Sequence, residues 1–178
     1  MHGKWAMQRR IWIIGYGNKE RCDDGAGPVV AERLQFMFRN RPEIIIRSVH
    51  QLDPVLVDDT NPPEDVILID ATLDQQVNGL RVQMLMPEKI PLPFSLHHLP
   101  PGLFLELLGQ YHGYYPSAWL VTIQGNDFGF GTGLTGETEK RALRAVKVIA
   151  GLAVMKVIDS PKDIKGQSLS AKGVKYEK

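Results

Sequence analysis

The sequence is poor in the features that mark several common classes of protein. It has a single cysteine, Cys22, in 178 residues, so an internal disulfide framework is excluded and a reducing compartment is expected. No apolar run approaches the roughly 18 residues that a membrane-spanning helix needs. The first ten residues are too short and too polar for a signal peptide. These absences predict a soluble cytoplasmic protein.

Neither sign of charge dominates the chain. It carries 21 basic and 20 acidic residues, which gives a formal net charge of +1. A strong positive field would attract nucleic acid or an anionic membrane surface, and none is present here. We therefore expect neither nucleic acid nor membrane as a partner.

The common catalytic and nucleotide-binding motifs are also missing. The chain contains no H-E-x-x-H, no G-x-S-x-G and no C-x-x-C, which are typical of zinc peptidases, serine hydrolases and thiol redox proteins. Gly15 and Gly17 begin a dinucleotide fingerprint, but Glu20 stands where its third glycine belongs and would face a pyrophosphate. No G-K-[ST] completes a phosphate-binding loop. No nucleotide cofactor is expected.

The most informative stretch is a glycine-rich turn that follows a short apolar segment. Residues 11–14 are all apolar, as expected for a strand buried on both faces of a parallel sheet. Gly15 and Gly17 permit backbone conformations that other residues avoid and allow close approach of a ligand. The acidic pair Asp23 and Asp24 then precedes a helical pattern. One carboxylate could cap that helix, but two are more than a cap requires.

Apolar strands alternate with helical patterns along the rest of the chain, which predicts an α/β fold. We expect a three-layer sandwich: a twisted, mostly parallel central sheet of about five strands, with helices on both faces. An N-terminal extension is expected over residues 1–10, a single domain over 11–158 and a polar tail over 159–178. The expected strands are 11–14, 44–49, 66–69, 80–86 (antiparallel or at an edge) and 119–123, and the helices are 25–39, 54–59, 102–109 and 135–158.

Acidic side chains and histidines follow the predicted strands. Ligands of open α/β sheets bind beyond the carboxyl ends of the strands, a rule that selects Asp23 and Asp24 after the first strand, His50 after the second and Asp70 after the third. Oxygen and nitrogen ligands without thiolate suit borderline metals such as nickel or zinc. Two carboxylates and an imidazole that converge from three loops therefore predict a metal-binding or acid–base site.

Each of these residues also has a structural interpretation. Asp70 could cap a turn at the end of its strand. His97 and His98 could be an exposed polar pair in the proline-rich segment 87–101. Cys22 could act as a nucleophile beside a helix N-terminus, although a loop cysteine without a catalytic role is the preferred interpretation.

Taken in order, the motifs resemble those of the hydrogenase maturation proteases. The similarity runs from about residue 11 to residue 158, and it is the ordered set that makes it specific. The matching motifs are Gly15-Tyr-Gly-Asn18, Asp23-Asp24-Gly25-x-Gly27-Pro28, Gln51-Leu52-x-Pro54, Ile69-Asp70-Ala71 and Ser95-x-His97.

The resemblance implies an endopeptidase that removes a C-terminal extension from the nickel-loaded large-subunit precursor of a nickel–iron hydrogenase. The three metal-contacting positions of the family fall on Asp24, Asp70 and His97, with His98 as the alternative imidazole. The metal implied is nickel presented by the substrate, or another divalent metal in its place. The large-subunit precursor is the partner implied. A non-catalytic metal-binding assembly factor on the same scaffold is the alternative function.

Overall fold

The protein is built around one five-stranded sheet. The computed structural model describes residues 9–89 and 99–158. The strand order is β2-β1-β3-β5-β4, and all neighbours are parallel except β4, which pairs antiparallel with β5 at one edge. The expected sheet and its antiparallel edge strand are confirmed. The strands are β1 (Ile11–Tyr16), β2 (Ile44–Val49), β3 (Asp65–Thr72), β4 (Leu80–Leu85) and β5 (Ser117–Gln124).

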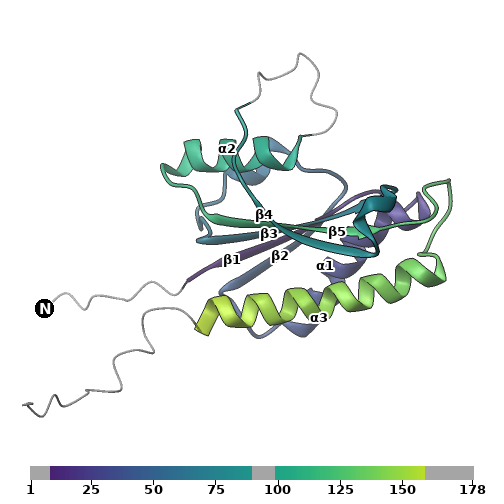
Figure 1. Ribbon diagram of the computed structural model, residues 1–178. Helices are drawn as coiled ribbons and strands as arrows, with labels where there is room; N and C mark the ends of the chain where they lie inside the picture. Colours follow the sequence, from purple (N-terminus) through teal and green to yellow (C-terminus); the bar gives the residue numbers. More distant parts are fainter. Residues whose placement is uncertain (1–8, 90–98, 159–178) are drawn as a thin grey trace, which may run out of the picture.

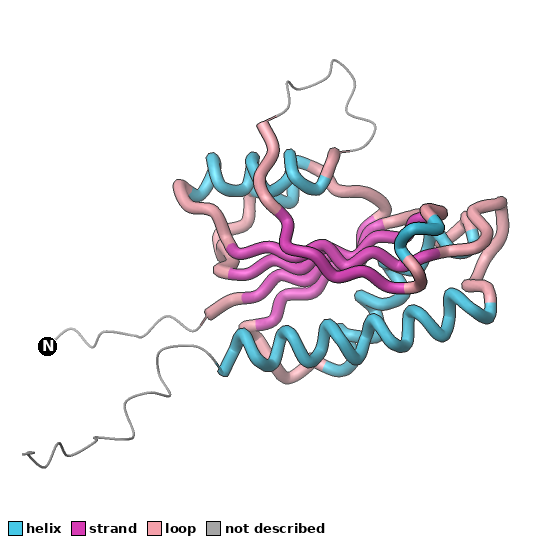
Figure 2. The backbone as a smooth tube through the Cα atoms, in the orientation of Figure 1, coloured by secondary structure: helices cyan, strands magenta, loops and turns pink. Residues whose placement is uncertain are grey.

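Helices cover both faces of this sheet, as the three-layer prediction required. Figure 1 shows α1 (Ala26–Met37) and α3 (Gly136–Ile158) on one face and α2 (Pro101–His112) on the other. The same three layers are seen in the backbone trace of Figure 2. Three short 3₁₀ helices lie in the connections: η1 (Cys22–Gly25), η2 (Pro54–Val57) and η3 (Gln75–Val77).

The unbroken apolar run of β1 is explained by burial on both of its faces. Ile11 and Ile13 pack into the core on the α1 and α3 side, whereas Trp12 and Ile14 pack into the core beneath α2. All four side chains are fully buried, because successive side chains of a strand point to opposite faces. The same alternation directs Tyr16, the last residue of β1, toward the α2 face, where it packs against that core.

Two strands differ from their sequence-based predictions. β3 extends from Asp65 to Thr72, so Asp70 lies inside the strand opposite Thr122 and not beyond its end as predicted. β4 has the predicted alternation, but Val82 and Met84 are 39% and 67% exposed. Among the described residues, only the ends of β4 pack against the cores, through Leu80 on the α1 and α3 side and Leu85 on the α2 side.

Two glycines bring α1 into backbone contact with the sheet. A Cβ atom at Gly15 of β1 would lie 2.1 Å from the carbonyl oxygen of Gly27 in α1. A Cβ atom at Gly27 would lie 2.4 Å from the carbonyl oxygen of Tyr16 and 2.6 Å from that of Ile69. No side chain fits at either position, so the first turn of α1 rests directly on β1 and β3. The requirement at Gly15 thus comes from helix packing and not from a ligand.

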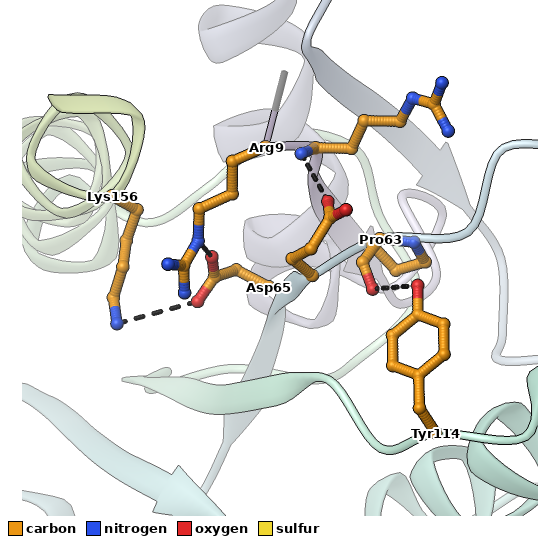
Figure 3. Close-up of polar contacts among 7 residues, drawn as sticks. Arg9, Pro63, Asp65, Tyr114 and Lys156 are labelled. Atoms are coloured by element: carbon orange, nitrogen blue, oxygen red, sulfur yellow. Dashed lines mark hydrogen bonds and ion pairs between the residues drawn. The ribbon is translucent and has the colours of Figure 1, made fainter. Parts of the chain in front are cut away.

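A buried ion cluster lies at the amino-terminal edge of the sheet, where β3 begins. Asp65, the first residue of β3, is fully buried and forms an ion pair with Arg9. Lys156 of α3 approaches the same carboxylate at 3.5 Å and also lies 4.1 Å from the ring centroid of Trp119. Figure 3 shows Arg9 and Lys156 reaching Asp65 from two sides. A buried carboxylate requires such partners, because leaving it unpaired is strongly destabilising.

Some sequence-based predictions concern residues outside the described ranges. They are the polar tail over 159–178, most of the N-terminal extension over 1–10, and the histidines His97 and His98. Among the helices of residues 9–89 and 99–158, none combines the length and the apolar character needed to cross a bilayer.

The glycine contact gives a test of the fold. Replacing Gly27 by Ala should lower the free energy of unfolding by about 2 to 3 kcal/mol, because the added methyl group would overlap two backbone carbonyls. The matched control is Gly151→Ala in α3, where a Cβ atom meets nothing within 4 Å. That change should raise stability by up to about 1 kcal/mol, since alanine favours the helix. Urea unfolding of the two variants measures both effects, and equal effects would contradict the packing argument.

Candidate functional site

Asp24 and Asp70 line one cavity at the carboxyl edge of the sheet. The cavity has a volume of about 380 Å³. Its walls come from the end of β1 and the following loop, the residues after β2, Asp70 of β3 and the start of α2. The two carboxylates are 46 positions apart in the chain, and the parallel pairing of β1 with β3 brings them to the same edge.

Asp24 is held in place by the loop that precedes it. It lies in η1, between β1 and α1, and is half-buried. One of its carboxylate oxygens, Oδ2, accepts a hydrogen bond from the backbone N–H of Asn18 at 2.9 Å. A carboxylate has two oxygens with several lone-pair sites, so this bond orients the group and leaves it able to bind a cation.

Asp70 reaches the cavity from within β3. Because side chains alternate along the strand, it shares the α2 face with Leu68 and Val66. Its Oδ1 accepts the backbone N–H of Ala71 at 2.8 Å. The Tyr16 hydroxyl faces the Asp70 carboxylate, and burial together with this negative charge raises the pKa of Tyr16 above its ordinary value. Tyr16 is therefore a neutral hydroxyl beside Asp70 at physiological pH.

Asp23 has a different role from its neighbour Asp24. Its side chain is fully buried and accepts five hydrogen bonds from the segment after β5 and from the first turn of α3. Burial acts to raise the pKa of Asp23, but these bonds outweigh it and the pKa is lowered overall. Asp23 is thus a structural anchor and not a ligand. The donors are the backbone N–H groups of Asn126, Asp127 and Thr135 at 2.8, 3.1 and 2.6 Å, and the hydroxyls of Thr135 and Thr138, both at 2.8 Å.

Gly17 shapes the loop that leads from β1 to Asp24. Its φ of +140° lies in the region that favours glycine, and a Cβ atom there would lie 2.0 Å from the carbonyl oxygen of Asp24. Its N–H donates to the carbonyl of His50 at 3.1 Å. The predicted requirement for glycine at this position is confirmed, and its cause is close contact with the backbone of Asp24.

Of the remaining candidate residues in the described ranges, His50 lines the cavity and Cys22 does not. His50 lines the cavity, as its position after β2 predicted. Cys22 is not among the lining residues; its N–H donates to the carbonyl of Gly131 at 3.0 Å. His97 and His98 lie outside the described residues. Leu99, two positions after His97, lines the cavity together with the first residues of α2.

Sequence reasoning gave no role to two residues that line the cavity. Tyr16 was missed although the alternation within β1 already places it on the same face as Trp12 and Ile14. Arg21 also lines the cavity, and its Nε donates to the carbonyl of Phe128 at 3.1 Å. No local signal identifies Arg21, because its position depends on a loop 107 residues later in the chain.

The arrangement suits binding of a cation by oxygen ligands. In residues 9–89 and 99–158, no three His, Cys, Asp or Glu side chains are close enough together to hold a metal ion. The two carboxylates alone form an incomplete site, because borderline divalent metals are ordinarily held by more ligands. A metal ion at this position would need further ligands from elsewhere in the chain or from the bound molecule.

Comparison with known proteins identifies the architecture. No family model and no curated protein matches the chain, but solved structures do. The [NiFe] hydrogenase maturation protease HycI from Thermococcus kodakarensis is 25% identical, with a TM-score of 0.66 over 80% of this chain and 91% of that one. The chain therefore has the fold of a hydrogenase maturation protease. The family resemblance predicted from the motifs is confirmed.

Two further hydrogenase maturation peptidases have the same fold. HybD from E. coli, a hydrogenase maturating endopeptidase, is 23% identical with a TM-score of 0.57, over 82% of this chain and 93% of that one. A hydrogenase 2 maturation peptidase from a Thaumarchaeota archaeon is 17% identical with a TM-score of 0.61, over 83% of this chain and 99% of that one. The fold class is confirmed over nearly the whole length of these proteins.

The hydrogen bonds of Asp23 predict how stability depends on pH. The folded-state pKa of Asp23 lies below its ordinary value of 3.8. The contribution of the Asp23 carboxylate to the free energy of unfolding is therefore complete above about pH 4, and it is lost as the pH falls through the folded-state pKa. Asp23→Asn should cost about 2 to 3 kcal/mol at pH 7, since bonds to a charged acceptor are lost. The difference in unfolding free energy between Asp23→Asn and wild type should decrease below about pH 4.

The control for this test is Asp127→Asn. Asp127 is exposed, and its Oδ1 accepts the Gly129 N–H at 2.7 Å, a bond that asparagine retains. Its unfolding free energy should stay within about 0.5 kcal/mol of wild type. Urea unfolding between pH 2.5 and pH 7 measures both variants. A difference for Asp23→Asn that stays constant over this range would contradict the assignment.

Proposed function

We propose that this protein is an endopeptidase that removes a C-terminal extension from the nickel-loaded large-subunit precursor of a nickel–iron hydrogenase. Asp24, Asp70 and His97 recognise the nickel that the precursor presents. The observation that carries the proposal is the single cavity shared by Asp24 and Asp70, in a fold that known hydrogenase maturation proteases also have. A cytoplasmic location remains a prediction that goes with this function.

The chemistry of the donor set supports a nickel-recognition role. Two carboxylate oxygens and one imidazole nitrogen suit a borderline divalent cation. Leu99 lines the cavity and lies two positions from His97 along the chain, so an imidazole at position 97 is a reasonable third ligand. Because only three protein ligands are proposed, the remaining coordination positions belong to the precursor's own ligands. In this proposal the ion arrives with the substrate, so no metal-activated water is invoked.

The enzyme's own residues would orient the precursor. Asp24 is held by the Asn18 N–H and Asp70 by the Ala71 N–H, so both carboxylates are preorganised before the cation arrives. Tyr16 adds a neutral hydroxyl beside Asp70, and Arg21 adds a positive charge to the same cavity. Together they offer the precursor acceptors for the metal and donors for nearby carbonyl or carboxylate groups.

A non-catalytic assembly factor is the second candidate function. It is favoured by one observation: among the described residues, the lining of the cavity includes no serine, threonine or cysteine. A nucleophile of the usual type is therefore not identified there. Such a factor would bind the nickel-loaded precursor in the same cavity and leave its chain intact.

Incubation with precursor separates the two functions. The purified protein should release the C-terminal peptide from nickel-loaded precursor and leave nickel-free precursor uncut, because the metal completes the recognition site. Mass spectrometry of the large subunit before and after incubation measures the loss. Tight binding without any loss of mass would reject the protease and support the assembly factor. Cleavage of both forms at equal rates would reject recognition through nickel.

Substitution of the proposed ligands tests the site itself. Asp70→Asn and His97→Ala should abolish processing and weaken nickel binding in isothermal titration, because each removes one ligand. For Asp70→Asn, stability should change by less than about 1 kcal/mol, since the side chain keeps its size and its oxygen can still accept the Ala71 N–H. The control Asp74→Asn alters an exposed carboxylate that accepts the Gln76 N–H in the turn after β3, and it should process normally.

The neighbouring histidine provides the second control. His98→Ala should retain activity if His97 is the ligand. Loss of activity in His98→Ala with a normal His97→Ala would move the assignment by one residue. Normal processing by both variants would remove the imidazole from the proposed site.

A further inference from the structure

A second cavity lies directly beside the carboxylate cavity. It has a volume of about 390 Å³, close to the 380 Å³ of the first. Three residues, Gly17, Asn18 and His50, line both cavities. Each volume falls within the roughly 300 to 1,000 Å³ typical of ligand pockets. The two cavities therefore form one groove at the carboxyl edge of the sheet, which is longer than a metal ion alone would need.

The boundary between the two cavities is formed by the three shared residues and is held by a backbone hydrogen bond. The Gly17 N–H donates to the His50 carbonyl at 3.1 Å, which ties the loop after β1 to the end of β2. Gly17 has no side chain, so only Asn18 and His50 contribute side chains at this boundary. Because the two cavities share these lining residues, an extended chain bound in one can continue into the other.

The second cavity is lined by polar and apolar groups together. Lys19 and Ser48 contribute polar groups, and Val49 with Pro28 contributes apolar surface. On the rim, Glu32 accepts hydrogen bonds from Lys19 at 2.9 Å and from Ser48 at 3.2 Å. These contacts are exposed, so rearranging them on binding costs little. Donors, acceptors and apolar surface in one groove suit a peptide, whose main chain is polar and whose side chains vary.

We propose that the second cavity, lined by Lys19, Ser48 and Val49, binds the segment of the precursor's C-terminal extension that follows the scissile bond. This inference rests on the proposed function, since it concerns the substrate of the same site. The nickel and its ligands occupy the cavity of Asp24 and Asp70. The extension is a chain with a free end, so it can lie along the groove past His50 while the folded body of the large subunit stays outside.

A bulky residue in the second cavity tests this assignment. Ser48→Tyr should raise KM for nickel-loaded precursor about tenfold and change kcat by less than twofold, because the reacting cavity is untouched. The matched control is Ser117→Tyr. Ser117 is likewise a strand serine, exposed where Ser48 is half-buried. It pairs with Asp65 at the opposite edge of the sheet, and its variant should match wild type. Equal KM for wild type and Ser48→Tyr, or an equal rise in both variants, would overturn the subsite.

Photo-cross-linking separates failure of the subsite from failure of the proposed function. Position 48 or position 117 is replaced by p-benzoylphenylalanine, and each protein is irradiated with nickel-loaded precursor. A cross-link from position 48 to the C-terminal extension, absent from position 117, supports the subsite even if no cleavage occurs. Cross-links from position 48 only to the mature large subunit, or none, overturn it, even if the wild-type protein cleaves the precursor.

Discussion

One buried carboxylate connects the segments of the molecule on which the site depends. Asp23 receives all its hydrogen bonds from residues that lie more than 100 positions later in the chain. It thereby joins η1, which carries Asp24, to the segment that leads from β5 into α3. Fully buried charge is tolerated only when it is well hydrogen-bonded, and here the five bonds meet that condition. The position of Asp24 thus depends on contacts made by its neighbour.

Three glycines also determine the position of η1, through close backbone contacts. Gly15 and Gly27 allow α1 to rest on the backbone of β1 and β3, and Gly17 fits against the carbonyl of Asp24. Side chains at these positions would push the helix away from the sheet and displace η1. The carboxylate cavity is therefore formed by backbone packing beneath it as well as by the side chains that line it. Such support keeps both aspartates in place before any ligand binds.

Much of the fold could be predicted from local pattern, whereas several features of the site could not. The apolar strands, the antiparallel edge and the carboxyl-edge rule all follow from periodicity and chain order. Asp23 and Asp24, in contrast, are adjacent carboxylates with the same local surroundings in sequence. Their roles differ because Asp23 meets Thr135 and Thr138, a long-range contact that no local pattern contains. The position of Asp70 inside β3 was missed for a similar reason, since pairing with β5 extends the strand through it.

The ion cluster at Asp65 also affects how the molecule responds to force. Arg9 stands just before β1, Lys156 stands near the end of α3, and both are paired with the same buried carboxylate. β1 is a central strand with parallel partners on both sides. Separating residues 9 and 156 would require at least one of the two cations to leave Asp65. The start of β1 and the end of α3 are thus joined to each other through Asp65, at the edge of the sheet opposite the cavity.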